Sequence, residues 1–311
     1  MTPFTPAPPE WSAEQMIEDF DNGGVATGVL SMPQPGIWWG GRDRTRAVAR
    51  ESNEYNATLM SDYPGRFGMF AAVPGPTDID GSLLEVEYVY DVLNADGLGM
   101  KTNYHKVGNG TYFEDQWLGD PAFAPLYEEL NRRNAVIYTH PQDAACCLGL
   151  VPNINRVAVE YQTNTSRTIW NLLMTGTAAR YPNITWIFSH GGGTVPFLIQ
   201  RLLGVETAAY LRDGGALAEG ATQPSASEEL PRGALYELQR FYYDTAATSN
   251  PVSMSALRNV VPVSQIVFGS DNPYGQPSAI ANGLEVSGVF NAQELQAINH
   301  ENMARVLPRY A

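Results

Sequence analysis

The sequence has little cysteine, few basic residues and no long apolar run. Its 311 residues include two cysteines, the neighbours Cys146 and Cys147, which excludes a disulfide framework and C-x-x-C metal or redox motifs. Lysine and arginine number 19 against 33 acidic residues, so the net charge is −14. Because nucleic-acid binding needs a basic face, nucleic acid is excluded as a partner.

No apolar stretch reaches the roughly 18 residues of a membrane-spanning helix, so we expect no membrane association. The first residues, MTPFTPAPPEW, lack the basic segment and the apolar segment of a secretory signal. Hydrophobic residues make up 44% of the chain, which is enough for a well-buried core. Together these features predict a cytoplasmic enzyme.

Short apolar runs recur along the chain, and helical-looking segments separate them. The runs are almost continuously apolar, which is typical of strands buried on both faces of a parallel sheet. Amphipathic stretches at 123–134 and 168–182 lie between runs, and Pro182 is a helix stop signal. This alternation predicts a single α/β domain over residues 1–311. The seven runs occupy 25–31, 67–73, 97–102, 135–140, 184–190, 241–246 and 264–271.

The number and order of these runs predict a (β/α)₈ TIM barrel that lacks its first strand. A closed barrel needs eight strands, whereas a helix at 12–24 precedes the first run, with Ser12 and Gln15 placed as a capping box. The proline-rich residues before this helix cannot form a central strand. An open doubly wound sheet is the alternative that fits the count.

Two connections are unusually long, at 103–122 and 203–234. Connections of this length are usually functional lids or partly mobile segments. Within the second, residues 216–233 have the composition of a linker, and we expect them to form an excursion over the surface.

Three of the predicted strands end in side chains that can bind a metal or transfer a proton: His140, His190 and Asp271. The carboxyl ends of barrel strands form one face, where these residues would converge. Three glycines follow His190, and we expect them to let the backbone approach a ligand closely. Read singly, His140 could be a hydrogen-bonded core histidine and Asp271 a turn cap. We expect His105 and His300 to be structural or solvated.

The segments VIYTHP, ARYPNITWIFSHGGGTVPF and IVFGSDNPYG, in this order and spacing, resemble the amidohydrolase-2 branch of the amidohydrolase superfamily. This branch includes metal-dependent, non-oxidative decarboxylases of aminocarboxymuconate semialdehyde, γ-resorcylate and 6-methylsalicylate. The resemblance covers residues 12–311 and is nearest to the 6-methylsalicylate type.

The resemblance implies a (β/α)₈ barrel with one divalent metal, zinc or manganese. His140 and Asp271 then correspond to metal ligands, and His190 to a histidine near the metal that acts on the substrate and is a third candidate ligand. Asp271 also corresponds to the proton donor. The implied activity is decarboxylation of an ortho-hydroxy aromatic acid, with a small aromatic carboxylic acid as substrate and a homodimer as the assembly.

One motif of the family is absent. Its first strand carries two further metal ligands in a His-x-His motif, which this sequence does not contain. Three candidate ligands are the minimum for a catalytic zinc site. A shortened reading frame and a variant that has lost its metal both explain the absence. A metal-dependent hydrolase of a lactone or amide and a catalytically dead barrel therefore stay open beside the decarboxylase.

Four further residues are candidates for substrate binding. Trp38 and Trp39 follow the first predicted strand and could stack on an aromatic ring. Asn103 follows the third predicted strand, and Tyr274 follows Asp271.

Overall fold

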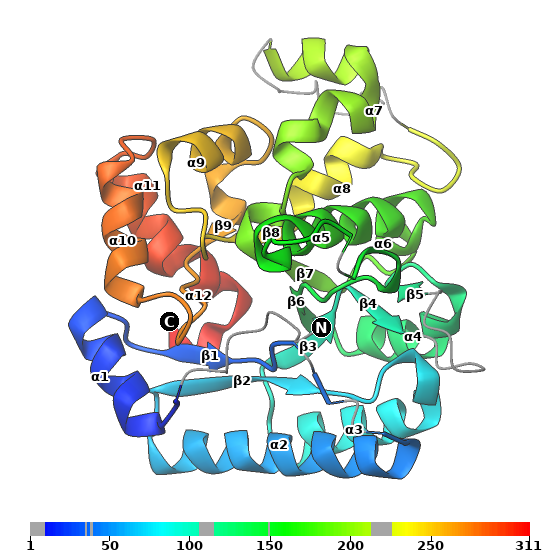
Figure 1. The fold of residues 1–311 in the computed structure, drawn as a ribbon, viewed down its shortest axis with the longest axis vertical. Helices are drawn as coiled ribbons and strands as arrows, with labels where there is room; N and C mark the ends of the chain where they lie inside the picture. Colours follow the sequence, from blue (N-terminus) through cyan, green and yellow to red (C-terminus); the bar gives the residue numbers. More distant parts are fainter. Residues whose placement is uncertain (1–9, 35, 38–39, 106–114, 149, 213–225) are drawn as a thin grey trace.

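The computed structural model describes residues 10–34, 36–37, 40–105, 115–148, 150–212 and 226–311. Seven parallel strands form one curled sheet (Figure 1). Every strand of this sheet lies within one of the seven predicted apolar runs, which confirms those predictions. The strands are β1 (Gly28–Leu30), β2 (Phe67–Ala72), β3 (Gly97–Lys101), β6 (Val136–His140), β7 (Thr185–Phe188), β8 (Tyr242–Asp244) and β9 (Ile266–Val267).

The strands are hydrogen-bonded in chain order, from β1 through β2, β3, β6, β7 and β8 to β9. This order is that of a barrel, and it excludes a doubly wound sheet, in which the order reverses at a switch point. In the part of the chain that the structure describes, β1 and β9 form the two edges, and no strand pairs with the outer side of either. The sheet is therefore an incomplete barrel that begins with the strand after α1 (Ala13–Gly23), as predicted.

Helices cover the outside of the sheet (Figure 1). α1 begins where predicted, and the Ser12 hydroxyl accepts a hydrogen bond from the Gln15 amide at 3.1 Å. The Gln15 side chain instead contacts residues of its own helix, so only half of the expected capping box forms. The other helices are α2 (Arg42–Asp62), α3 (Ile79–Asp91), α4 (Ala124–Arg132), α5 (Arg156–Met174), α6 (Thr177–Arg180), α7 (Val195–Arg212), α8 (Ala234–Arg240), α9 (Pro251–Arg258), α10 (Pro277–Val286), α11 (Ala292–Gln296) and α12 (Asn302–Val306).

The two long connections contain more regular structure than predicted. Within the first, β4 (Asn103–His105) and β5 (Asp115–Trp117) form an antiparallel pair. The second is shortened because α7 extends to Arg212, across a non-helical residue at Gly204. Most of the expected surface excursion at 216–233 lies outside the described residues.

The C-terminal segment packs against the sheet. Its Leu307 forms one buried cluster with Phe70, Ile187 and Val267. The Tyr310 hydroxyl of the same segment donates to Asp96, just before β3, at 3.0 Å. The C-terminal segment thus covers the amino ends of the strands, which leaves the carboxyl ends as the open face.

The helical layer continues across the gap between the sheet edges. α1 packs against α10 (Figure 1), and the Asn272 side-chain amide donates to Asp19 on α1 at 2.8 Å. Within the described residues, no helix is long and apolar enough to cross a membrane. Cys146 and Cys147 are bonded to each other, so no disulfide joins separate parts of the chain.

Candidate metal centre and active site

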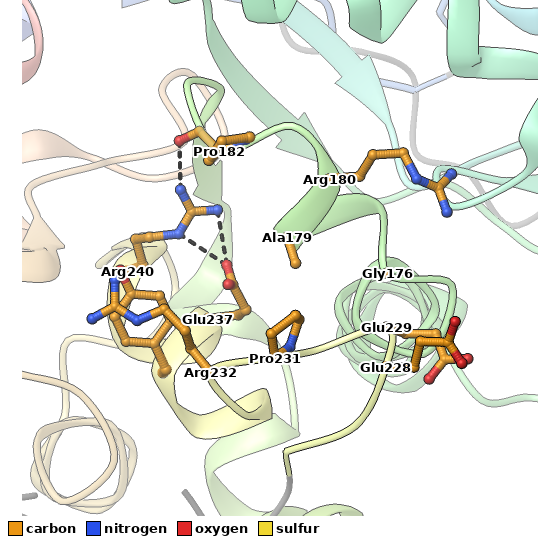
Figure 2. A pocket seen from close by; sticks show the side chains of 11 residues that line it. Gly176, Ala179, Arg180, Pro182, Glu228, Glu229, Pro231, Arg232, Glu237 and Arg240 are labelled. Atoms are coloured by element: carbon orange, nitrogen blue, oxygen red, sulfur yellow. Dashed lines mark hydrogen bonds and ion pairs between the residues drawn. The ribbon is translucent and has the colours of Figure 1, made fainter. Parts of the chain in front are cut away.

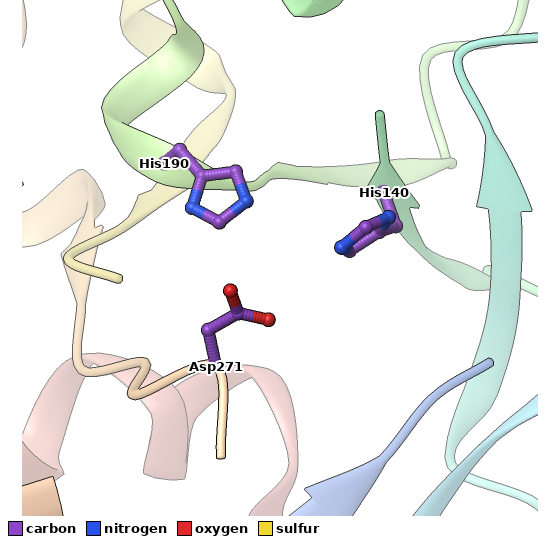
Figure 3. Close-up of side chains that lie close together, drawn as sticks. All are labelled: His140, His190 and Asp271. Carbon is purple, nitrogen blue, oxygen red and sulfur yellow. The ribbon is translucent and has the colours of Figure 1, made fainter. Parts of the chain in front are cut away.

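His140, His190 and Asp271 come together at the carboxyl ends of the strands. His140 is the last residue of β6, His190 follows β7, and Asp271 follows β9. One potential ligand atom from each lies within 4.8 Å of the other two. Figure 3 shows the three side chains around a common space. We call these residues the His-His-Asp cluster.

Both histidines of the cluster are oriented by backbone carbonyl groups. Nδ1 of His140 lies 2.8 Å from the Pro141 oxygen, and Nδ1 of His190 lies 3.2 Å from the Ala246 oxygen. A carbonyl only accepts, so each Nδ1 carries a hydrogen, and in the neutral ring the lone pair is on Nε2. Burial, together with the nearby Lys101 and His190, holds the pKa of His140 well below its ordinary value. Neutral imidazoles are the form that binds a metal.

The backbone at two cluster residues is unusual. His190 has φ of 55° and Asp271 has φ of 59°, a left-handed region that side chains with a Cβ rarely adopt. The His190 amide donates to Asp244 Oδ1 at 2.7 Å, and the Asp271 carbonyl accepts from the amides of Tyr274 and Gly275. These bonds hold both side chains over the barrel axis, in backbone conformations of a kind that cluster at functional sites.

Two of the three glycines after His190 pack closely against the protein itself, and the close approach of a ligand to this turn stays a prediction. Gly192 and Gly193 have positive φ. A Cβ on Gly192 would lie 2.7 Å from the Tyr243 ring, and one on Gly193 would lie 2.2 Å from the Gln162 oxygen of α5. The turn therefore needs glycine because α5 and β8 press against it.

Asp244, at the end of β8, supports the cluster and was not among the predicted residues. Its Oδ1 accepts from the amides of His190 and Ala246, and its Oδ2 accepts from the Tyr138 hydroxyl at 3.0 Å. Burial raises its pKa. The signal that identified the cluster, a polar residue ending a buried strand, was also present in the run at 241–246.

Asp271 is a carboxyl group that can be protonated near neutral pH. Burial raises its pKa to about 6, against the lowering effect of His190. The cluster thus contains two imidazoles that can act as ligands or bases and one acid that is available in both forms.

The residues of the cluster fit a divalent metal. Two histidines and one carboxylate are a known ligand set for transition metals, and three protein ligands with an open position are typical of catalytic zinc. The Pro141 and Ala246 carbonyls accept from the other nitrogen of each ring and fix its orientation, as is usual for histidines that bind a metal.

A cavity of about 270 Å³ lies at the carboxyl ends of β1, β2 and β3. Its lining includes Lys101, the last residue of β3, which pairs in register with His140 of β6. Lys101 is 6% exposed, and burial lowers its pKa to about 7. Its ammonium donates to the Met32 carbonyl. Lys101 was also missed from the sequence, although it too ends a buried strand.

The four residues predicted to bind substrate do not come together in the described structure. Trp38 and Trp39 lie outside the described residues. Asn103 is buried, and its side-chain amide donates to the Asp143 carbonyl at 3.1 Å. Tyr274 is 56% exposed beside Asp271. Neither lines the cavity at β1–β3, so substrate contact by any of the four stays a prediction.

Of the two histidines outside the cluster, His105 lines the β1–β3 cavity and His300 does not. His105 lies 2.6 Å from Asp115 across the β4–β5 pair, which agrees with a structural role. His300 is exposed on the C-terminal helical segment.

A second cavity, of about 370 Å³, lies between α6 and α8 (Figure 2). Its charged groups include Arg240, which donates to Glu237 at 2.9 Å and to the Pro182 carbonyl at 2.6 Å. No residue of the His-His-Asp cluster lines it. We therefore place the candidate active site at the cluster and the β1–β3 cavity.

The chain is similar to several known proteins. The sequence profile of the family described as Amidohydrolase matches residues 7–309. Decarboxylase yanB of Aspergillus niger is 32% identical over 97% of this chain and 80% of its own length. The 6-methylsalicylic acid decarboxylase of Penicillium expansum is 33% identical over 92% of this chain and 82% of its own length.

Among solved structures, the fold is similar to that of a dihydroxybenzoic acid decarboxylase from Polaromonas sp. JS666 with bound manganese and the inhibitor 2-nitroresorcinol. The TM-score is 0.79, with 18% identity over 96% of this chain and 87% of the other. The match of the family profile along nearly the whole sequence, together with the two relatives above 30% identity, establishes that the chain belongs to the amidohydrolase family.

Proposed function

We propose that this protein is a metal-dependent, non-oxidative decarboxylase of an ortho-hydroxy aromatic acid of the 6-methylsalicylate type. The observation that carries the proposal is the meeting of His140, His190 and Asp271 within 4.8 Å, with Asp271 protonatable near neutral pH. The decarboxylases among the relatives support the reaction class.

The chemistry needs an acid beside the reacting ring carbon. Loss of CO₂ from an aromatic acid leaves an electron pair on that carbon unless the carbon is protonated first. In the proposed reaction, Asp271 donates its proton to the carbon that carries the carboxylate. The bond to the carboxylate then breaks, its electron pair restores the aromatic ring, and CO₂ leaves. Asp271 is left ionised and regains a proton from solvent.

The other cluster residues position the substrate. Because Nδ1 of His190 is engaged by the Ala246 carbonyl, its Nε2 has one role at a time: it accepts a hydrogen bond from the ortho hydroxyl, or it ligates the metal. His140, Asp271 and His190 would hold the metal, and zinc and manganese both suit this ligand set. When bound, such an ion supplies positive charge that binds and polarises carboxylate and phenolate oxygens. The homodimer remains a prediction.

The test is CO₂ release from 6-methylsalicylate by the purified chain supplied with zinc or manganese. Loss of a general acid costs about 10²- to 10⁴-fold, so we expect Asp271→Asn to lower kcat by at least about 100-fold. Asp80→Asn, at an exposed aspartate of α3, is the control and should leave kcat unchanged. A near-normal rate for Asp271→Asn would overturn the assignment.

The same assay separates the alternatives from the sequence. Hydrolysis of lactones or amides without CO₂ release would indicate a hydrolase on the same cluster, with His190 as base. No turnover of either substrate class, with no metal bound, would indicate a catalytically dead barrel.

A further inference from the structure

Lys101 is a buried amine for which the described chain provides no counter-ion, and a bound anion would favour its charged form. It ends β3 with 6% of its surface exposed, and its Nζ donates to the neutral carbonyl of Met32. Other basic side chains near the sheet form ion pairs: Arg46 pairs with Asp78, and Arg50 pairs with Glu85. No carboxylate of the described residues pairs with Lys101. A buried charge without an opposite charge is costly, so such a site favours an anionic ligand.

The cavity beside Lys101 suits a flat apolar body. Its walls include Met32, Ile37, Val73 and Pro74, and its volume of about 270 Å³ is close to the range of small-molecule sites, roughly 300–1,000 Å³. Lys101 is opposite His140 in the β3–β6 register. A ligand in the cavity would therefore have its charged end toward the His-His-Asp cluster.

The side-chain amides of Gln34 and Gln142, which line the cavity, already form hydrogen bonds within the protein. Gln34 donates to Asp143 at 2.7 Å and accepts from the Tyr161 hydroxyl, and Gln142 donates to the Asn103 carbonyl at 3.1 Å. The wall also contains Thr77, Tyr104 and His105, and His105 pairs with Asp115. Lys101 is thus the basic group of this wall that no carboxylate of the described residues pairs with. One cation above an apolar wall favours a monoanion such as a carboxylate over a phosphate, which needs several donors.

We propose that Lys101 binds the carboxylate of an aromatic acid whose ring occupies the cavity at β1–β3, and that this residue selects acids over neutral aromatic compounds. The inference rests on the proposed function in one respect, since the acid bound here would be the substrate.

The experiment is a ligand-observed NMR titration of the metal-free chain with salicylate and with its neutral analogue, salicylamide. Hydrogen bonds to charged groups contribute about 1.5–3 kcal/mol. We therefore expect Lys101→Met to weaken salicylate binding about 10- to 100-fold and to change salicylamide binding by less than about 3-fold. Lys101→Arg keeps the charge and should retain part of the affinity for salicylate.

Arg180→Met is the matched control, because Arg180 is a cation that lines the other cavity, and it should leave both affinities unchanged. Three results would overturn the proposal: no salicylate binding by the wild-type chain at millimolar concentration, wild-type affinity in Lys101→Met, or equal loss of both ligands in Lys101→Met. If Lys101→Met does not fold, as judged by circular dichroism, Lys101→Gln replaces it with the same expected results.

This titration needs neither metal nor turnover, so it can fail independently of the proposed reaction. Selective salicylate binding through Lys101, without CO₂ release by the metal-loaded chain, would refute the decarboxylase and leave the binding site intact. CO₂ release with an unchanged KM in Lys101→Met would refute the role of Lys101 and leave the decarboxylase intact.

Discussion

His190 of the His-His-Asp cluster is held by groups from the neighbouring strand end and the turn after it. Asp244 holds the backbone of His190 and the turn whose Ala246 carbonyl orients the His190 ring. The cluster itself could be predicted from sequence, because a polar residue that ends a buried apolar strand is a strong local signal. Asp244 and Lys101 carry the same signal, but their partners are distant in sequence and only the fold shows them.

At the residue scale, the burial of Asp271 has a consequence for stability. Its pKa rises from 3.8 to about 6 in the folded chain. A raised pKa means that the folded state favours the protonated carboxyl group. Its contribution to the free energy of unfolding is full below pH 3.8, the unfolded pKa, and is lost as the pH rises through about 6. At neutral pH, the ionised carboxylate therefore destabilises the metal-free protein.

We predict that Asp271→Asn stabilises the metal-free chain above pH 6 by at most about 3 kcal/mol, and that the gain disappears toward pH 4. Urea unfolding in the presence of a chelator at several pH values measures this. The exposed Asp80→Asn should show no such pH-dependent gain. A variant that is less stable than the wild type at pH 7.5 would contradict the raised pKa.

At the element scale, the strands could be predicted because each is a nearly continuous apolar run, as in Phe67–Ala72 and Thr185–Phe188. The β4–β5 pair could not be predicted, because its strands are short and half-buried and each depends on pairing across a connection. The first half of α5 was also missed, since exposed Val157 and Val159 blur its amphipathic pattern.

One side chain ties α2 to both β2 and α3. The buried Asn53 accepts from the Ala72 amide at 2.8 Å and donates to the Ala72 carbonyl and to Glu85, each at 2.9 Å. Asn53→Ala leaves these buried groups without partners, which costs about 1–3 kcal/mol for each unsatisfied group.

We predict that Asn53→Ala lowers the free energy of unfolding by about 2–4 kcal/mol, measured by urea denaturation. Asn56→Ala, on the same helix at a partly exposed position, should change it by less than about 0.5 kcal/mol. Equal effects of the two substitutions would contradict the role of Asn53.

At the scale of the whole molecule, the sheet is open between β1 and β9 while the helical layer continues through the contact of α1 with α10. Leu307 of the C-terminal segment packs against the sheet, and Tyr310 donates to Asp96, just before β3. The C-terminal segment thus packs against the sheet on the side away from the site. The described chain supplies three candidate metal ligands to that site.

The metal content of the purified 311-residue chain, measured by elemental analysis after loading with zinc or manganese and desalting, tests the central claim most directly. We predict about one ion per chain, since three ligands suffice for a catalytic site, and loss of that ion in His140→Ala. A wild-type chain that retains no metal, or a His140→Ala variant that retains as much as the wild type, would contradict the metal centre.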